Sequence, residues 1–420
     1  MSNSPVENRE SGKRHYGYVI VLCMALIMGV NVGLVMSSAG IFYQPVSSDL
    51  GVSVGKLGIY MSFNFLSSTL MLSIAGRLMD KYSARMLLTL SSAVLGLTVV
   101  AMGLFNAVWQ FYIAGSVIGV TLSFLLYLSF PTMINRWFKS RVGFFIGICS
   151  AASGIGGIIF NPLGGYLITH YGWRTTYMLF GGIIFLLVTP IIGVLLRNYP
   201  DDMGLQPYGL DNQLQTSVSG SGIEYSSAVK MPVFYGMIVF AFLMISVSTL
   251  NLFIPKYVTS LDYTLEQASF AASAVMAGVT IGKVALGMIN DKNSLLGVAT
   301  TVVGGITGLA LLFIGHVGIW AVTAGGFLFG WAYAGVTVET PMLVRAVFGS
   351  KDYAKIYSNV SIAFAAGGAI MSGGWGLLAD FTTFRFILSL GIAFLTISGV
   401  IGVLALKVRK TETAALAEVS

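Results

Sequence analysis

Long runs of mainly apolar residues follow one another along this chain, and they constrain its fold more than any other feature. A helix needs roughly 20 apolar residues to cross the hydrocarbon core of a bilayer. Only 9% of the 420 residues are charged, whereas roughly 25% is usual in a soluble domain. The chain is therefore expected to be an all-α membrane protein. Twelve spans are predicted near residues 16–43, 55–76, 86–106, 109–135, 142–169, 175–196, 232–258, 266–289, 295–314, 317–346, 354–379 and 384–406.

The basic residues predict the topology of these spans. Of the 23 lysines and arginines, one lies inside a run, and four, Lys56, Arg174, Lys256 and Arg385, lie in connections that follow odd-numbered runs. The other eighteen lie in the tails and in the connections on the opposite side. Because basic residues concentrate on the cytoplasmic side, both termini are expected in the cytoplasm. We thus expect a multi-pass protein of the cell inner (plasma) membrane.

The longest polar stretch divides the runs six and six, and its Ser/Gly-rich composition is typical of a linker. Two bundles joined in this way permit the rocking motion of alternating access. The predicted organisation is a cytoplasmic tail over residues 1–15, a six-helix bundle over 16–196, a cytoplasmic linker over 197–231, a second six-helix bundle over 232–406 and a cytoplasmic tail over 407–420.

Several classes of function are disfavoured. The basic residues form small clusters between apolar runs rather than one patch, so a nucleic-acid partner is not expected. Cys23 and Cys149 lie within apolar runs, and the sequence has no metal-ligand cluster, nucleotide-binding loop or catalytic triad motif. We therefore expect no enzyme, no cofactor and no metal site. A membrane sensor without transport is a weaker alternative, because no signalling domain is expected in tails of about fifteen residues.

A charged motif joins the second and third runs. Residues 76–85 read GRLMDKYSAR, and residues 287–292, six helices later, repeat part of the motif as GMINDK. This motif resembles the loop signature of the major facilitator superfamily, and the resemblance implies two related halves. Charges at helix ends can pair in one state and separate in another, so a gating role is predicted for Arg77, Asp80, Lys81, Arg85 and Asp291. The alternative is simple membrane anchoring by basic residues.

Three further segments are similar to one branch of that superfamily, the monocarboxylate porters and oxalate/formate antiporters. They are NRWF at 135–138, GWR at 172–174 and DDMGLQPYG at 201–209. The resemblance implies that the substrates are small carboxylates, moved with protons or exchanged for another anion.

Two ionisable side chains, Lys283 and Glu339, lie well inside predicted spans. A charge at the bilayer centre costs roughly 2.5–3.5 kcal/mol on insertion scales, so each should face protein or a wet cavity. Both lie roughly 12–14 Å from the same membrane face at 1.5 Å per residue, and an ion pair between them is therefore possible.

The resemblance implies a role for Lys283, and burial of a carboxyl group suggests one for Glu339. Lys283 follows Gly282 at the place where the family carries Gly-Arg, whose Arg binds the substrate carboxylate. Lysine supplies the charge but not the bidentate fork of arginine. Glu339, two residues before Pro341, is the candidate proton-coupling site. The alternatives are that Lys283 is only a counter-ion to Glu339 and that Glu339 makes only a hydrogen bond between helices.

Uncharged residues are expected to complete a substrate cavity, although each of these types is more often a packing residue. The candidates are Asn31, Ser38, Tyr127, Asn251, Trp331, Tyr333, Tyr357 and Asn359. The first span has no charge and the eleventh has no basic residue beyond its start, so one carboxylate fits better than a dianion. We expect a monomeric, proton-coupled carrier of small monocarboxylates that works by alternating access. An efflux carrier for hydrophobic compounds and an organic-anion exchanger are the alternatives.

Overall fold

The computed structural model describes residues 15–209 and 222–417. The predicted N-terminal tail, apart from residue 15, and the middle of the predicted linker lie outside this part of the chain. The described residues contain eleven helices that are long and apolar enough to cross a membrane. One of them, Val142–Leu195, makes two crossings, because Gly172 has the left-handed φ of 81° and breaks the helix there. Twelve crossings result, which confirms the predicted all-α, twelve-helix fold.

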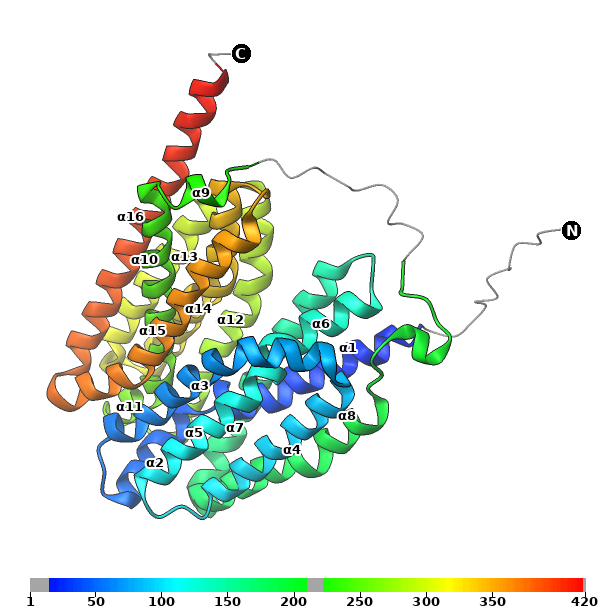
Figure 1. Ribbon diagram of the computed structural model, residues 1–420. Coiled ribbons are helices and arrows are strands. Elements are labelled where there is room, and N and C mark those ends of the chain that lie inside the picture. Colours follow the sequence, from blue (N-terminus) through cyan, green and yellow to red (C-terminus); the bar gives the residue numbers. More distant parts are fainter. Residues whose placement is uncertain (1–14, 210–221, 418–420) are drawn as a thin grey trace, which may run out of the picture.

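The first half of the chain forms one helical body, shown in blue to green in Figure 1. Its helices are α1 (Gly17–Leu26), the π-helical η1 (Ile27–Ser37), α2 (Gly40–Leu50), α3 (Val54–Lys81), α4 (Ala84–Met102), α5 (Val108–Leu122), the π-helical η2 (Ser123–Leu128), α6 (Ser129–Trp137), α7 (Val142–Gly182), the π-helical η3 (Ile183–Val188) and α8 (Thr189–Leu195). The short η4 (Pro200–Met203) follows this bundle.

The second half forms the other body, shown in green to red. Its helices are α9 (Tyr225–Ala228), α10 (Pro232–Ser248), the 3₁₀ turn η6 (Thr249–Phe253), α11 (Ile254–Thr259), α12 (Leu265–Lys292), α13 (Ser294–Phe313), η7 (Gly315–Val317), α14 (Ile319–Phe348), α15 (Tyr353–Phe381) and α16 (Phe384–Ala417). The last helix extends beyond residue 406 because the chain there is rich in the strong helix formers Leu, Ala, Lys and Glu.

The two bodies repeat one another in length and local sequence. Helices α3 and α12 both have 28 residues. Each begins after a hydroxyl residue, Ser53 or Thr264, whose side chain accepts a hydrogen bond from the third backbone N–H of the helix. Each also ends in Asp-Lys. This repeat agrees with the two related halves that the GRLMDK motif implied.

The two bundles contact each other along two pairs of helices, α7 with α12 and α3 with α15. In the first pair, Gly154 of α7 lies against Thr280 of α12, so a side chain on Gly154 would overlap the threonine. In the second pair, the hydroxyl groups of Ser62 and Ser372 lie 3.3 Å apart, and the backbone N–H of Gly373 donates to Ser62 Oγ. Small residues thus permit close approach of helices from different bundles.

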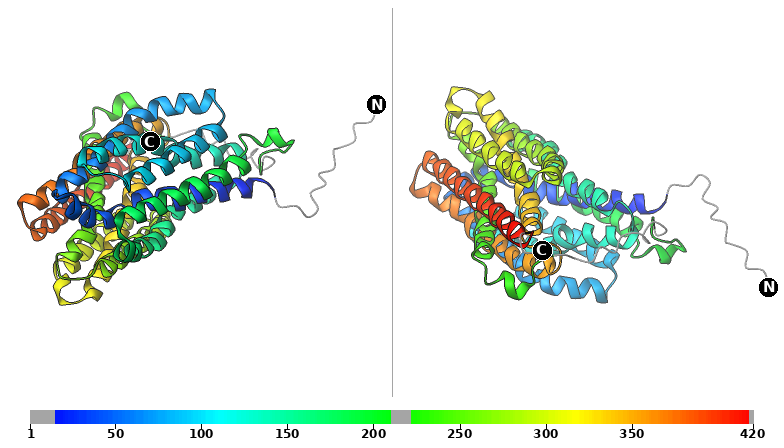
Figure 2. Two further views of the ribbon diagram at one scale, coloured as in Figure 1. Left: turned by 90° about the horizontal axis from the view of Figure 1, so that it is seen from below. Right: turned by 90° about the horizontal axis from the view of Figure 1, so that it is seen from above.

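These contacts are confined to one end of the molecule. We call the end where α1 begins and α16 ends the terminal end, and the opposite end, which carries the loop after α2, the far end. Near the terminal end a Cβ atom on Gly143, Gly147 or Gly287 would meet nothing within 4 Å. Figure 1 shows the bundles diverging toward the terminal end, and the views in Figure 2 show the same two bodies from above and below. The structure is therefore closed at the far end and open at the terminal end.

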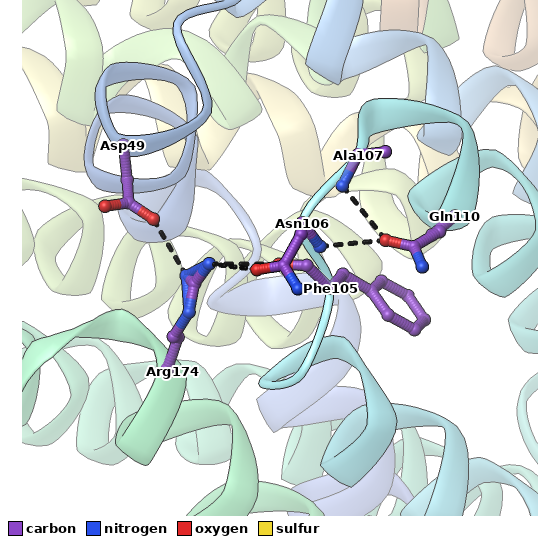
Figure 3. A network of polar contacts seen from close by, with 6 residues as sticks. All are labelled: Asp49, Phe105, Asn106, Ala107, Gln110 and Arg174. Carbon is purple, nitrogen blue, oxygen red and sulfur yellow. Dashed lines mark hydrogen bonds and ion pairs between the residues drawn. The ribbon is translucent and has the colours of Figure 1, made fainter.

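A polar network fixes the far end of the first bundle (Figure 3). Arg174 forms an ion pair with Asp49 at 2.8 Å and donates to Asn106 Oδ1 at 2.8 Å and to the Phe105 carbonyl at 3.2 Å. Gln110 in turn accepts a hydrogen bond from the Asn106 backbone N–H. The network ties α2, the α4–α5 loop and the second crossing of α7 together, so these elements are expected to move as one body.

Gly156 offers a direct test of packing inside the first bundle. A Cβ atom at Gly156 would overlap the carbonyl group of Gly29 in η1, whereas one at Gly143 on the same helix meets open space. We expect Gly156→Ala to lower the unfolding free energy by about 1–3 kcal/mol, the usual cost of overpacking. Gly143→Ala should leave it unchanged or slightly raised. Thermal unfolding of the two purified variants checks this, and equal melting temperatures would contradict the packing described here.

Candidate functional site

Lys283 lies where the two bundles begin to separate. Its ammonium group reaches from α12 across to α7 and donates to the carbonyl oxygen and to the hydroxyl oxygen of Ser150, both at 3.3 Å. One turn further toward the terminal end, Gly147 and Gly287 face open space. The side chain of Lys283 is only partly exposed. The lysine therefore makes the contact between α7 and α12 that lies next to the opening.

The charge of Lys283 has no acidic partner among the described residues. The three ion pairs of that part of the chain are His170 with Glu266, Arg174 with Asp49, and Lys351 with Glu224. Ser150 supplies two oxygen acceptors but no negative charge. A cation in a low-dielectric site is costly unless an anion compensates it.

Glu339 lies inside the second bundle, with none of its surface exposed. Its Oε1 atom accepts hydrogen bonds from Asn290 Nδ2 of α12 at 2.8 Å and from Thr301 Oγ1 of α13 at 3.1 Å. The sequence suggested an ion pair between Glu339 and Lys283, because both lie at a similar distance from the same membrane face. This ion pair is not formed. The reason is direction, since Glu339 points into its own bundle whereas Lys283 points toward the other bundle.

The surroundings of Glu339 are suited to a carboxyl group that gains and loses a proton. Its contacts are neutral, and its second oxygen, Oε2, is buried without a hydrogen-bond partner, as is Asn290 Oδ1. A buried ionised carboxylate with one unsatisfied oxygen is costly, whereas a protonated carboxyl removes the charge and gains an O–H donor. Asn290 lies on the same helix as Lys283, so α12 connects the two candidate sites.

The first-bundle candidates are not gathered around Lys283. Asn31 is fully buried and donates to Ser92 Oγ at 3.0 Å, and Thr189 donates to the same hydroxyl, so Asn31 belongs to the interior of the first bundle. Ser38 donates to the Gly33 carbonyl of its own helix. Tyr127 is different, because 39% of its side chain is exposed.

The candidates in the second bundle also include both buried and partly exposed residues. Asn251 is buried in η6 with its Oδ1 atom unpartnered. The ring of Trp331 lies against Gly304 of α13. Tyr357 stacks on Tyr353 at a centroid distance of 5.6 Å.

Four of the second-bundle candidates, Trp331, Tyr333, Tyr357 and Asn359, are partly exposed. Asn359 donates to the Lys355 carbonyl of its own helix at 2.9 Å. Tyr333 lies on α14 of the second bundle and is partly exposed, as Tyr127 of the first bundle is.

The predicted gating residues lie at the terminal end. Arg77, Asp80, Lys81 and Asp291 are exposed and form no ion pair within the described parts of the chain. Arg85 instead donates from Nε to the Gly193 carbonyl of α8. The described residues therefore form no ion pair between the bundles at the terminal end, where the structure is open.

Sequence reasoning did not identify three residues that define the two sites. They are Ser150, the partner of Lys283, and Asn290 and Thr301, the partners of Glu339. Asn290 directly precedes Asp291 and was interpreted only as part of a loop motif. For Ser150 the available signal is a polar residue within the small-residue stripe of α7, between Gly147 and Gly154.

Known proteins resemble this chain in sequence and fold. The family model described as Major Facilitator Superfamily matches residues 21–317. Multidrug resistance protein MdtG of Escherichia fergusonii is 25% identical over 191 residues, which cover 44% of this chain and 45% of the relative. Monocarboxylate transporter 4 of Mus musculus is 23% identical over 178 residues, covering 40% of this chain and 36% of the relative. The chain thus spans less than half the length of either relative.

A crystal structure of a bacterial homologue of the human lysosomal transporter Spinster, in an inward-facing and occupied conformation, has the same fold. It superposes with a TM-score of 0.72 at 14% identity and covers 94% of this chain and 97% of its own. At this identity the likeness concerns the fold alone. Because the family model covers most of the chain and the twelve crossings form two repeated bundles, the chain belongs to the major facilitator superfamily of secondary transporters and is a membrane transporter rather than an enzyme.

Proposed function

We propose that this transporter carries small monocarboxylates and that Lys283 binds the carboxylate group. The observation that carries the proposal is the position of the Lys283 ammonium, which lies between the bundles beside the opening with only the neutral oxygens of Ser150 as partners. An entering anion supplies the missing negative charge at the point that both bundles contact.

The two acceptors on Ser150 support this assignment. Its carbonyl and hydroxyl oxygens both lie 3.3 Å from the Lys283 nitrogen, so the ammonium group already has two neutral acceptors. Hydrogen bonds of this length are long for an ammonium donor and therefore weak. A carboxylate can displace them and form shorter, charge-assisted bonds.

Glu339 is the proposed proton site, which makes the carrier a proton symporter. Loss of the proton creates an uncompensated charge beside Asn290, and this changes the contacts of α12, the helix that carries Lys283. Substrate binding and proton binding thereby act on the same helix from opposite sides.

We place the terminal end in the cytoplasm, since the basic residues of the chain concentrate there. The structure then represents the inward-open state of a protein in the inner membrane. Its likeness to an inward-facing solved structure supports this assignment. A single chain supplies both bundles, so a monomer suffices for alternating access.

Efflux of hydrophobic compounds is the competing function, and the similarity to MdtG favours it. The partly exposed aromatic residues Tyr127 and Tyr333 also suit an apolar substrate. The two functions differ in their need for the charge on Lys283, because a neutral or cationic compound gains nothing from an ammonium group.

Counterflow in proteoliposomes tests the proposal. Vesicles that hold a high concentration of an unlabelled monocarboxylate should accumulate the labelled compound, and empty liposomes should not. Labelled lipophilic cations should give no counterflow. Counterflow of the lipophilic cation without that of the carboxylate would show that the chain is an efflux carrier instead.

The closed far end gives a prediction for alternating access itself. The hydroxyls of Ser62 and Ser372 lie 3.3 Å apart on different bundles, so cysteines at both positions are close enough for a disulfide. Oxidation of the S62C/S372C double variant should lock the far end and reduce transport to background. Reduction should restore it, and the single variants should be insensitive, since Cys23 and Cys149 are buried. Undiminished transport by the oxidised double variant would rule out opening at this interface.

A further inference from the structure

A cavity with polar and apolar walls lies at the far end, on the opposite side of the interface from the opening. Its volume is about 290 Å³. Because liquid water occupies about 30 Å³ per molecule, this space accommodates a small organic solute. Gln44, Ser47 and Ser53 line it from the first bundle, and Lys256 and Asp380 line it from the second.

Two polar groups beside this cavity, Gln44 Oε1 and the Lys256 ammonium, lack a hydrogen-bond partner among the described residues. Gln44 donates from Nε2 to Ser48 Oγ at 3.1 Å, but its Oε1 atom is buried and has no hydrogen-bond partner. The ammonium group of Lys256 makes no hydrogen bond or ion pair with any residue that the structure describes. Asp380 is near enough to interact electrostatically with Lys256 but not to form an ion pair with it. The cavity thus presents one cation and one anion.

Within the described parts of the chain, Asp380 makes one hydrogen bond, which crosses the interface. Its Oδ1 atom accepts a hydrogen bond from the backbone N–H of Gly55, at the start of α3, at 3.4 Å. This bond is long, so the carboxylate retains capacity for a further donor.

We propose that this cavity binds a small zwitterion of the α-amino acid type. The carboxylate of the ligand pairs with Lys256, and its ammonium group donates to Asp380. The site has one positive and one negative side chain, which matches a ligand with no net charge. A simple anion would meet Asp380 without a donor, and a simple cation would meet Lys256, so each satisfies only half of the site.

The proposed ligand favours one conformation of the transporter. Because the walls of the cavity come from both bundles, the site is assembled only while the far end is closed. A ligand that binds only this state shifts the population toward it. The zwitterion therefore acts as an inhibitor at a site separate from Lys283.

Calorimetric titration of the purified full-length Lys283→Gln variant, which lacks the proposed central anion site, tests the ligand class. L-alanine should bind measurably, while acetate and methylammonium, which each carry one of its two charges, should bind at least about tenfold more weakly, as expected when a charge-assisted bond of about 1.5–3 kcal/mol is lost. Equal binding of acetate would show a plain anion site. Failure of alanine, glycine and serine to bind would show that the cavity holds only water. Either result overturns the proposal.

Variants then locate the binding site. Lys256→Gln and Asp380→Asn should each weaken alanine binding at least about tenfold, the effect of one lost charged hydrogen bond. Lys56→Gln should leave alanine binding unchanged, because Lys56 is exposed near the same end but does not line the cavity. Lys283→Gln should also retain binding. Loss of binding in Lys283→Gln but not in Lys256→Gln would place the amino acid at the central site and refute this one.

Alanine should also speed disulfide formation in the S62C/S372C variant, because it stabilises the closed far end. Unchanged or slower disulfide formation at saturating alanine would contradict the proposed inhibition. This readout does not depend on which substrate the transporter carries.

Discussion

Uptake of a labelled monocarboxylate into proteoliposomes is expected to fall to the level of empty vesicles when Lys283 is replaced by glutamine. The change keeps a polar side chain of similar length but removes the charge that has no counter-ion within the described structure. Loss of one partner of a buried charge pair costs about 3–5 kcal/mol. The expected reduction in uptake is therefore about 100-fold or more.

Two control variants separate substrate binding from structural support. Lys283→Arg keeps the charge and should keep substantial uptake. Ser150→Ala removes the hydroxyl that holds the amine in this conformation, and it should leave uptake intact, because Ser150 acts only while no carboxylate is bound. Equal loss of uptake in Ser150→Ala and Lys283→Gln would mean that the contact merely holds the helices together.

Replacement of Glu339 by glutamine is expected to uncouple transport from the proton gradient. Glutamine keeps an oxygen that accepts from Asn290 and Thr301 but cannot take up or release a proton. Accumulation driven by an imposed pH gradient should fall to simple equilibration, while exchange of labelled for unlabelled substrate continues. Both are measured on the same vesicles, with and without the gradient.

Another glutamate, which lies on the bundle interface, provides the matched control. Glu266 of α12 faces His170 of α7 at 3.8 Å, and its side chain is 42% exposed. Glu266→Gln should retain accumulation driven by the pH gradient. Retained accumulation in Glu339→Gln, or equal loss in both variants, would remove the proposed role of Glu339.

The fold was largely predictable from the sequence because its determinants are local. A run of apolar residues must become a helix in lipid wherever it lies in the chain. The exceptions arise at helix ends. The first crossing continues through α2 to Leu50, beyond the predicted end at residue 43, because polar residues near the far end lie at the bundle interface rather than in a loop.

The candidate sites were predictable only in part, because a site depends on the directions of side chains from different helices. Lys283 and Glu339 each lie nine residues before the end of their helix, at Lys292 and Phe348, but depth along a helix does not tell which neighbour a side chain faces. The partner of Lys283 follows from the register of α7 against α12, which no single segment encodes.

The same limit applies to the uncharged candidates. Asn31 was predicted to line a substrate cavity, yet the structure gives Asn31 a partner in α4. A polar residue in a span has to satisfy its hydrogen bonds somewhere, and the interior of its own bundle is the nearest place. The roles of these residues in substrate binding stay predictions.

Calorimetric binding of a substrate panel to the purified protein tests the central assignment most directly. Small monocarboxylates should bind, dicarboxylates should bind more weakly, and monocarboxylate binding should disappear in Lys283→Gln. Tight binding of lipophilic cations, or carboxylate binding that persists without the lysine, would contradict the assignment of Lys283 as the anion site.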